Sequence, residues 1–175
     1  MGKLKVSVVL AMPSNADLES VRRTLDSFCE QDATPRQLQI VIYGKQPQIR
    51  RMFIERYKQR KEQEGVEINF REVPLFKDRT EALKHGAGFV DGLFLTFFES
   101  GQVYHRNTLS VLRAGLVAAG PRAAVAGMGL VALGLTTWRS LAGWNEEPPV
   151  STERILAACK KAKITIAEVS ILANE

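Results

Sequence analysis

Apolar strand-like runs alternate with amphipathic helix-like segments along the chain, and this alternation limits the possible folds more than any other feature. The run over 5–12 is apolar and rich in β-branched residues, which is typical of a strand buried on both faces of a parallel sheet. The segment over 17–30 then places its apolar residues on one helical face, with Ser14 or Asn15 as the expected N-cap. The predicted strands cover 5–12, 38–43, 66–73, 89–98, one or two strands in 123–137, and 164–172. The predicted helices cover 17–30, 47–64, 78–85, 107–119 and 151–163.

This order predicts the α/β fold class: a three-layer α/β/α sandwich around a mostly parallel central sheet, as in Rossmann-like proteins. The strand over 66–73 alternates apolar and polar residues, which predicts a position nearer a sheet edge. Ligands of such sheets bind outside the carboxyl ends of the strands. The site should therefore come from the loops over 11–15, 43–46, 73–79 and 96–101.

The length of 175 residues predicts a single domain over 1–175. The chain has two cysteines, Cys29 and Cys159, outside any metal-ligand spacing, which argues against structural zinc and favours a reducing, cytoplasmic setting. The N-terminus does not have the pattern of a signal peptide. The uncharged run over 123–138 is too short for a transmembrane helix, and its glycines favour buried strands separated by a turn.

The chain is basic, with a net charge of +5 and a pI near 9.4. This charge suits a phosphate-bearing ligand, an anionic membrane surface or nucleic acid, and it equally suits a solvated surface. Glutamates are interspersed with the basic residues of the helix predicted over 47–64, which favours an ion-paired face. Nucleic acid is not expected as a partner, because no aromatic-interleaved motif of a known binding module is present.

Several segments, taken in order, resemble the family 2 glycosyltransferases, which have the GT-A fold. They are Val6-Ser7-Val8-Val9-Leu10, Arg23-Thr24-Leu25-Asp26-Ser27, Gln31, Gln39-Ile40-Val41-Ile42, Glu81-Ala82-Leu83, Leu93-Phe94-Leu95 and Trp138-Arg139-Ser140-Leu141-Ala142-Gly143-Trp144-Asn145-Glu146. The resemblance spans nearly the whole chain and implies a cleft for a nucleoside-diphosphate sugar.

The chain departs from this family at three places that normally carry carboxylates. Tyr43-Gly44-Lys45 stands where the family has acidic residues for the base and ribose. Thr96-Phe97-Phe98 replaces the metal-binding Asp-x-Asp motif, with Glu99 one position further on. Ser151-Thr152 replaces the acidic pair that supplies the catalytic base, and Glu153 follows it. A divalent metal (manganese or magnesium) is therefore not expected, because such ions need hard oxygen ligands.

The candidate site residues follow from the resemblance and from these departures. Glu153 is the candidate catalytic base, and Glu99 is the one candidate for a residual metal ligand. Phe97 and Phe98 should point to opposite faces of the sheet, and an exposed phenylalanine there would block the nucleotide cleft. The candidate substrate-binding residues are Ser14, Lys77, Arg79 and Trp144. Lys77, Arg79, His85, His105 and Arg106 are candidate cations for a metal-free site.

Two hypotheses about function remain open. In the first, the chain is a glycosyltransferase-like pseudoenzyme, a binding or assembly module of polysaccharide biosynthesis with a protein partner or a second copy of itself. The expected location is the cytoplasm, and one alternative within this hypothesis is the inner face of the membrane. In the second, it is an active, metal-independent hexosyl-type glycosyltransferase that uses a nucleoside-diphosphate sugar.

Overall fold

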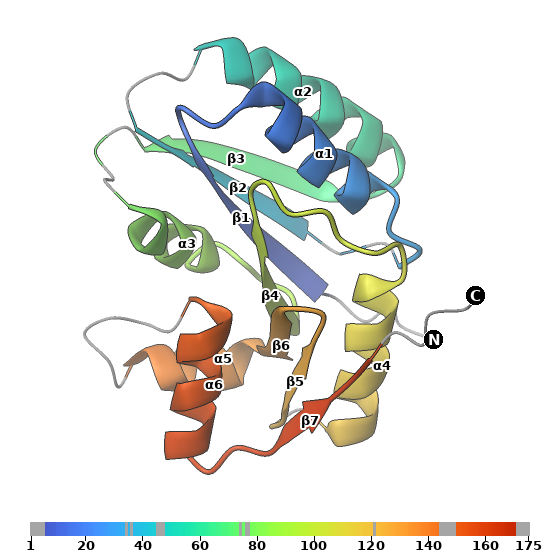
Figure 1. Ribbon diagram of the computed structural model, residues 1–175, viewed down its shortest axis with the longest axis vertical. Helices are drawn as coiled ribbons and strands as arrows, with labels where there is room; N and C mark the ends of the chain where they lie inside the picture. Colours follow the sequence, from blue (N-terminus) through green and yellow to red (C-terminus); the bar gives the residue numbers. More distant parts are fainter. Residues whose placement is uncertain are drawn as a thin grey trace.

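The computed structural model describes residues 6–33, 35, 37–44, 48–73, 75, 78–120, 122–143 and 150–170 (Figure 1). The strands are β1 (Val6–Pro13), β2 (Gln37–Tyr43), β3 (Glu67–Val73), β4 (Phe94–Glu99), β5 (Ala124–Gly127), β6 (Leu130–Gly134) and β7 (Ile166–Glu168). The helices are α1 (Leu18–Cys29), α2 (Gln48–Gln63), α3 (Arg79–Ala87), α4 (Thr108–Ala119), α5 (Leu135–Gly143) and α6 (Thr152–Lys161).

The strands form one seven-stranded sheet in the order β3-β2-β1-β4-β6-β5-β7. The pairs β1–β2, β1–β4, β2–β3 and β5–β7 are parallel, whereas β6 runs antiparallel to both β4 and β5. The predicted α/β class and mostly parallel sheet are confirmed. The alternating strand β3 lies at one edge, as its pattern predicts.

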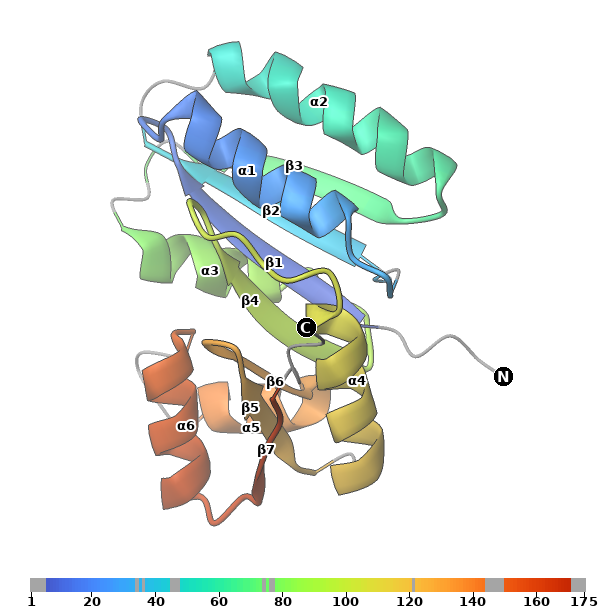
Figure 2. The same ribbon diagram turned by 45° about the vertical axis from the view of Figure 1, so that its right-hand side comes forward.

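Helices cover both faces of the sheet and create two hydrophobic cores (Figure 2). On one face, α1, α2 and α4 pack residues such as Phe28, Ile54 and Leu112 against β1, β2 and β4. On the other face, α3, α5 and α6 pack residues such as Leu83 and Trp138. Alternate residues of β1 enter opposite cores, which explains why its sequence is apolar throughout.

The structure differs from the predicted elements mainly around β4 and after β6. The strand predicted from position 89 begins at Phe94, because the chain turns at Gly92, whose N–H donates to Ser7 Oγ at 3.2 Å. The segment after β6 was not predicted as a helix, yet Leu135, Trp138 and Leu141 are buried at a three-residue spacing along α5. The last strand is shorter than predicted, with three residues.

Helix N-caps follow the local sequence. Asp17 caps α1, because its carboxylate accepts a hydrogen bond from Ser20 N at 2.9 Å, so the expectation of Ser14 or Asn15 was wrong. Asp78 and Ser151 cap α3 and α6, because their side chains accept hydrogen bonds from Glu81 N and Arg154 N.

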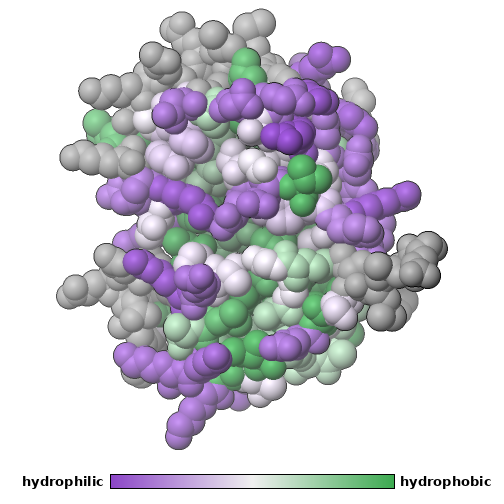
Figure 3. All heavy atoms as spheres, viewed as in Figure 1, coloured by the Kyte–Doolittle hydropathy of each residue, from purple (hydrophilic) through white to green (hydrophobic). Residues whose placement is uncertain are grey.

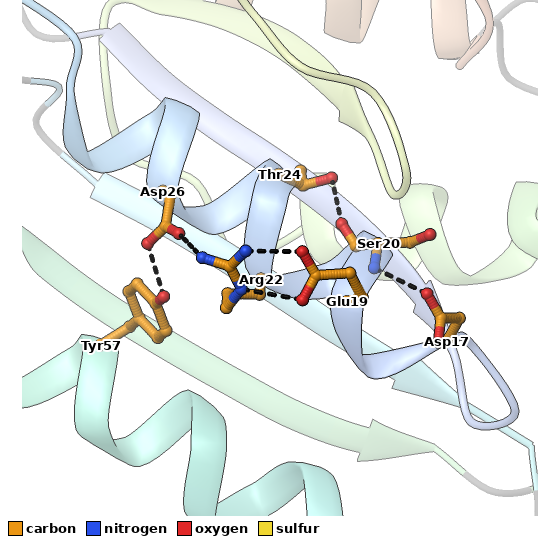
Figure 4. A network of polar contacts seen from close by, with 7 residues as sticks. All are labelled: Asp17, Glu19, Ser20, Arg22, Thr24, Asp26 and Tyr57. Atoms are coloured by element: carbon orange, nitrogen blue, oxygen red, sulfur yellow. Dashed lines mark hydrogen bonds and ion pairs between the residues drawn. The ribbon is translucent and has the colours of Figure 1, made fainter.

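A polar network joins α1 to α2 on the outside of the molecule (Figure 4). Tyr57 of α2 donates its hydroxyl to Asp26 at 2.5 Å, and Arg22 contacts the second oxygen of Asp26 at 3.1 Å. Arg22 also donates two hydrogen bonds to Glu19. Burial and the Asp26 carboxylate raise the pKa of Tyr57 to about 12, so the phenol stays protonated as a donor.

Polar and apolar residues are unevenly distributed over the molecular face drawn in Figure 3. Hydrophilic side chains dominate around α1, whereas apolar side chains are more frequent around α4, β5 and β7. Val117 of α4 is 59% exposed. Among the described residues, no helix has the length and apolar character needed to cross a membrane.

The close approach of α3 to the sheet yields a first prediction. A Cβ on Gly86 would lie 2.7 Å from a methyl of Val9 and 2.9 Å from a methyl of Val41. Gly86→Ala should therefore lower the free energy of unfolding by about 1–3 kcal/mol through overpacking. Urea denaturation measures the effect, and Lys84→Ala on the exposed side of the same helix is the control. Equal stability of the Gly86 variant and the wild type would contradict the packing.

The link between α1 and α2 yields a second prediction. Tyr57→Phe keeps the ring and removes the hydroxyl that donates to Asp26. Because the group is partly exposed, we expect a loss of about 0.5–1.5 kcal/mol of unfolding free energy. The same substitution in an Asp26→Ala background, which has no acceptor, should cost less, and a double-mutant cycle measures the difference. Additive effects would show that the hydrogen bond contributes nothing.

Candidate functional site

The carboxyl ends of β1, β2 and β4 meet at one edge of the sheet. The chain leaves β1 toward β2 on one side and returns to β4 on the other, so the strand order reverses between β1 and β4. Ligands of open α/β sheets bind at such a reversal. A cleft of about 260 Å³ opens there, lined by the ends of these strands and the first turns of α1 and α3. We call it the switch-point cleft.

A second cleft of about 280 Å³ lies beside the first, between the end of β4, the β5–β6 turn and the start of α6. We call it the hairpin cleft. Thr152 Oγ1 donates to the carbonyl of Gly129 at 2.9 Å and ties α6 to the turn. Met128 and Gly129 both have positive φ, of 57° and 74°, which makes the turn tight.

Glu99, the last residue of β4, lines both clefts. Its carboxylate accepts a hydrogen bond from Arg79 Nη2 at 2.5 Å, and the two side chains are 39% and 37% exposed. Arg79 is the first residue of α3, and its Nε is buried without a hydrogen-bond partner in the described part of the chain. The pair thus joins an element on one face of the sheet to the strand end at its centre.

The two phenylalanines before Glu99 belong to the cores rather than to the clefts. Phe97 packs near Trp138 in one core, with ring centroids 6.1 Å apart. Phe98 lies in the other, stacked on Tyr104 at 3.9 Å and edge-on to Phe28 at 6.1 Å. The prediction that they point to opposite faces is confirmed. Neither ring is exposed, so neither blocks a cleft.

Tyr104 fixes the backbone at the end of β4. Its hydroxyl accepts a hydrogen bond from Glu99 N at 2.7 Å, and burial raises its pKa to about 12. Gly101 N donates to Thr24 Oγ1 at 2.8 Å, which holds the following loop against α1. These contacts fix the backbone on both sides of Glu99, so only its side chain can change conformation without a change in the strand. Sequence analysis missed Tyr104, because a lone tyrosine in a loop carries no motif.

Gln31 supports the same region from the end of α1. Its side-chain amide donates to the carbonyl of His105 at 2.8 Å, and its oxygen accepts from Leu109 N at 2.9 Å. One buried side chain therefore fixes the chain between β4 and α4. This contact gives a physical role to a residue that the resemblance singled out.

The structure brings some of the predicted site residues together. Arg79 and Glu99 line the switch-point cleft, and Glu99 and Glu153 line the hairpin cleft. Ser14 is buried, its N–H donates to Tyr43 O at 2.6 Å, and a Cβ on Gly44 would lie 2.5 Å from its hydroxyl. Ser14 thus packs at the β1–β2 junction, and its role in substrate binding stays a prediction.

The other candidates lie elsewhere. Lys77 and Trp144 are outside the described residues. His85 packs edge-on against Phe89, with centroids 5.0 Å apart, and burial lowers its pKa. His105 Nδ1 is 2.7 Å from Asn107 Oδ1. Neither histidine lines the switch-point cleft or the hairpin cleft, nor does Arg106.

The donor set at the end of β4 does not fit a divalent ion. The carboxylate of Glu99 is already paired with a guanidinium, and the two positions before it carry phenyl rings. Within the described ranges, no group of three or more histidine, cysteine, aspartate or glutamate side chains could hold a metal. The pairing with Arg79 and the two phenyl rings thus leave no free carboxylate among the last three residues of β4 for a hard divalent ion.

No protein-family model and no curated protein matches this sequence. Solved structures do match. The mannosyltransferase PcManGT of Pyrobaculum calidifontis, in complex with GDP-Man and Mn²⁺, superposes with a TM-score of 0.73 at 14% identity over 96% of this chain and 55% of its own. Glucosyl-3-phosphoglycerate synthase of Mycobacterium tuberculosis, in complex with Mn²⁺ and UDP, gives 0.69 at 16% identity over 97% and 70%.

A third solved structure with the same fold is a synthase of another kind. The 4-diphosphocytidyl-2C-methyl-D-erythritol synthase of Anaerococcus prevotii matches with a TM-score of 0.67 at 9% identity, over 95% of this chain and 88% of its own. This chain spans little more than half of the mannosyltransferase. At these identities the similarity concerns the fold alone. The chain has a GT-A-like fold, as the sequence resemblance implies.

Proposed function

We propose that the chain binds a nucleoside-diphosphate sugar in the switch-point cleft and acts as a binding or assembly module that transfers no sugar. The observation that carries this proposal is the Arg79–Glu99 ion pair at the end of β4. It places a fixed cation in the cleft and occupies the carboxylate that could otherwise ligate a metal.

The cleft has features that suit such a ligand. Arg79 offers a cation for phosphate oxygens, and Tyr43, half-buried at the end of β2, offers an aromatic surface and a hydroxyl. Burial raises the pKa of Tyr43, so it remains a neutral donor. The mannosyltransferase was solved with GDP-Man and the glucosyl-3-phosphoglycerate synthase with UDP, both together with Mn²⁺, and these nucleotides support the ligand class.

The missing carboxylates support the non-catalytic part of the proposal. Sugar transfer needs positive charge on the departing diphosphate, which a metal often supplies. Here the carboxylate at the end of β4 is held by Arg79, and Phe97 and Phe98 fill the cores. A retained module would act through contacts in polysaccharide biosynthesis, with a protein partner or a second copy. The apolar side chains around α4 offer a surface for such contacts.

A specific observation favours a second candidate function, that of a metal-independent hexosyl-type transferase. Glu99 and Glu153 line the hairpin cleft next to the switch-point cleft. A carboxylate there could accept the proton of an acceptor hydroxyl while the hydroxyl oxygen attacks the anomeric carbon of the sugar. The bond from that carbon to the diphosphate would break, and Arg79 would stabilise the departing anion.

Ligand binding is the direct test of the first proposal. We expect the uridine, guanosine, cytidine or thymidine diphosphate that fits the cleft, or its sugar conjugate, to stabilise the protein equally with and without manganese. At a hundredfold excess over Kd the gain is about 2.7 kcal/mol. Thermal-shift measurement with Arg79→Gln should show a smaller gain, and Lys84→Gln on the same helix is the control. Binding that requires manganese, or no binding at all, would contradict the proposal.

The two functions differ in turnover. Under the first, purified protein with the bound nucleotide sugar releases no free nucleoside diphosphate above the spontaneous rate. Under the second, turnover occurs, and Glu153→Gln lowers kcat by about 10²–10⁴-fold because a general base is lost. Glu168→Gln, an exposed carboxylate on β7, is the control. Product quantification by chromatography distinguishes the two.

A further inference from the structure

We propose that Glu99 is a built-in competitor for the phosphate groups of the ligand. Its carboxylate holds Arg79 while the switch-point cleft is empty, and an entering diphosphate takes the guanidinium and releases Glu99 toward the hairpin cleft. The inference rests on the proposed function for the identity of the ligand, and it adds how binding in one cleft is linked to the other.

The first argument is the position of the charges. Among the described residues that line the switch-point cleft, Arg79 is the cation and Glu99 the anion. Their contact is 2.5 Å, and both side chains are more than one third exposed, so a ligand in the cleft can reach them. A diphosphate cannot approach Arg79 without meeting the Glu99 carboxylate, because the two charges share the space.

The second argument is the unused donor capacity of Arg79. A guanidinium carries five N–H groups arranged as a fork that fits two oxygens of a phosphate. The contact with Glu99 uses Nη2, while Nε is buried without a partner in the described part of the chain. A buried donor without an acceptor costs free energy. A diphosphate offers more oxygens to the exposed part of the guanidinium than the carboxylate does, so it can displace a carboxylate that engages one nitrogen.

The third argument is that Glu99 can move alone. Its backbone is fixed by β1, where Ala11 is its partner in the sheet, and by the hydrogen bond to Tyr104. Tyr104 is itself stacked on Phe98. The side chain lines both clefts, so a rotation about its side-chain bonds carries the carboxylate from one to the other with no change in the sheet.

The release changes the charge of the hairpin cleft. Glu153 already lines that cleft, and a second free carboxylate there would favour a ligand that donates hydrogen bonds or carries positive charge. Occupancy of the switch-point cleft would then raise the affinity of the hairpin cleft for such a ligand. By linkage, the reverse effect has the same magnitude.

The test measures the affinity of inorganic pyrophosphate by titration calorimetry at low salt and without divalent metal. If Glu99 competes, Glu99→Gln tightens binding by about fivefold, the upper range for an exposed ion pair. Arg79→Gln weakens binding, and adding Glu99→Gln to it gives no further gain. Glu81→Gln, which removes an exposed charge from the first turn of α3, is the control for net charge.

Four results would overturn the inference. They are unchanged or weaker pyrophosphate binding in Glu99→Gln, a gain that persists without Arg79, an equal gain in Glu81→Gln, and absence of pyrophosphate binding in every variant. The proposed function fails separately. If pyrophosphate binds with the expected variant pattern but no nucleoside diphosphate binds more tightly than pyrophosphate, Glu99 is still a competitor for phosphate groups, whereas the ligand is not a nucleotide.

Discussion

The double burial of β1 is the constraint on which the rest of the structure depends. β1 hydrogen-bonds to β2 on one side and β4 on the other, and its side chains enter both cores. Because all three strands are parallel, their carboxyl ends reach the same edge of the sheet. Helices α1 and α3 must then begin at that edge, on opposite faces. This geometry brings Ser20, Arg79 and Glu99 to one cleft although they are far apart in the sequence.

Packing at the end of β4 sets the chemistry of that cleft. Phe97 and Phe98 each contribute a large ring to a core, and burying such a ring is worth about 1.5–3 kcal/mol. Carboxylates at these positions would face apolar surroundings, where an unpaired charge is strongly disfavoured. The first carboxylate of β4 therefore appears at Glu99, where the strand leaves the core. The same packing that stabilises the sheet removes the oxygen ligands that a metal would need.

Local patterns were sufficient to predict most of the fold. The continuous apolar runs of β1 and β2 and the alternation in β3 are signals carried by neighbouring residues. The helix α5 was missed because its segment contains glycine, threonine and tryptophan, and the burial of Trp138 against Phe97 decides its conformation. Such tertiary contacts are not visible in a short window of sequence.

The candidate site was predictable only as a set of positions. The resemblance pointed to Arg79, Glu99 and Glu153 separately, but the pairing of Arg79 with Glu99 depends on how α3 crosses the sheet. Gly86 permits that crossing, because its missing Cβ lets the helix approach Val9 and Val41. The hydrogen bond of Tyr104 to Glu99 N forms because the loop after β4 turns back toward the end of that strand. Distances between elements, rather than residue types, decide these contacts.

An internal ion pair and a metal are different solutions to the same electrostatic problem. A metal held by carboxylates gives a diphosphate a strong positive charge, and the charge is present only when the ion is bound. Arg79 is always charged, so the chain would attract anions continuously if nothing balanced it. Glu99 provides that balance, and it is placed where it can also serve the neighbouring cleft. Under the proposed function, the paired arginine would keep the cleft locally neutral without a ligand, and ligand binding would be the event that exposes a carboxylate.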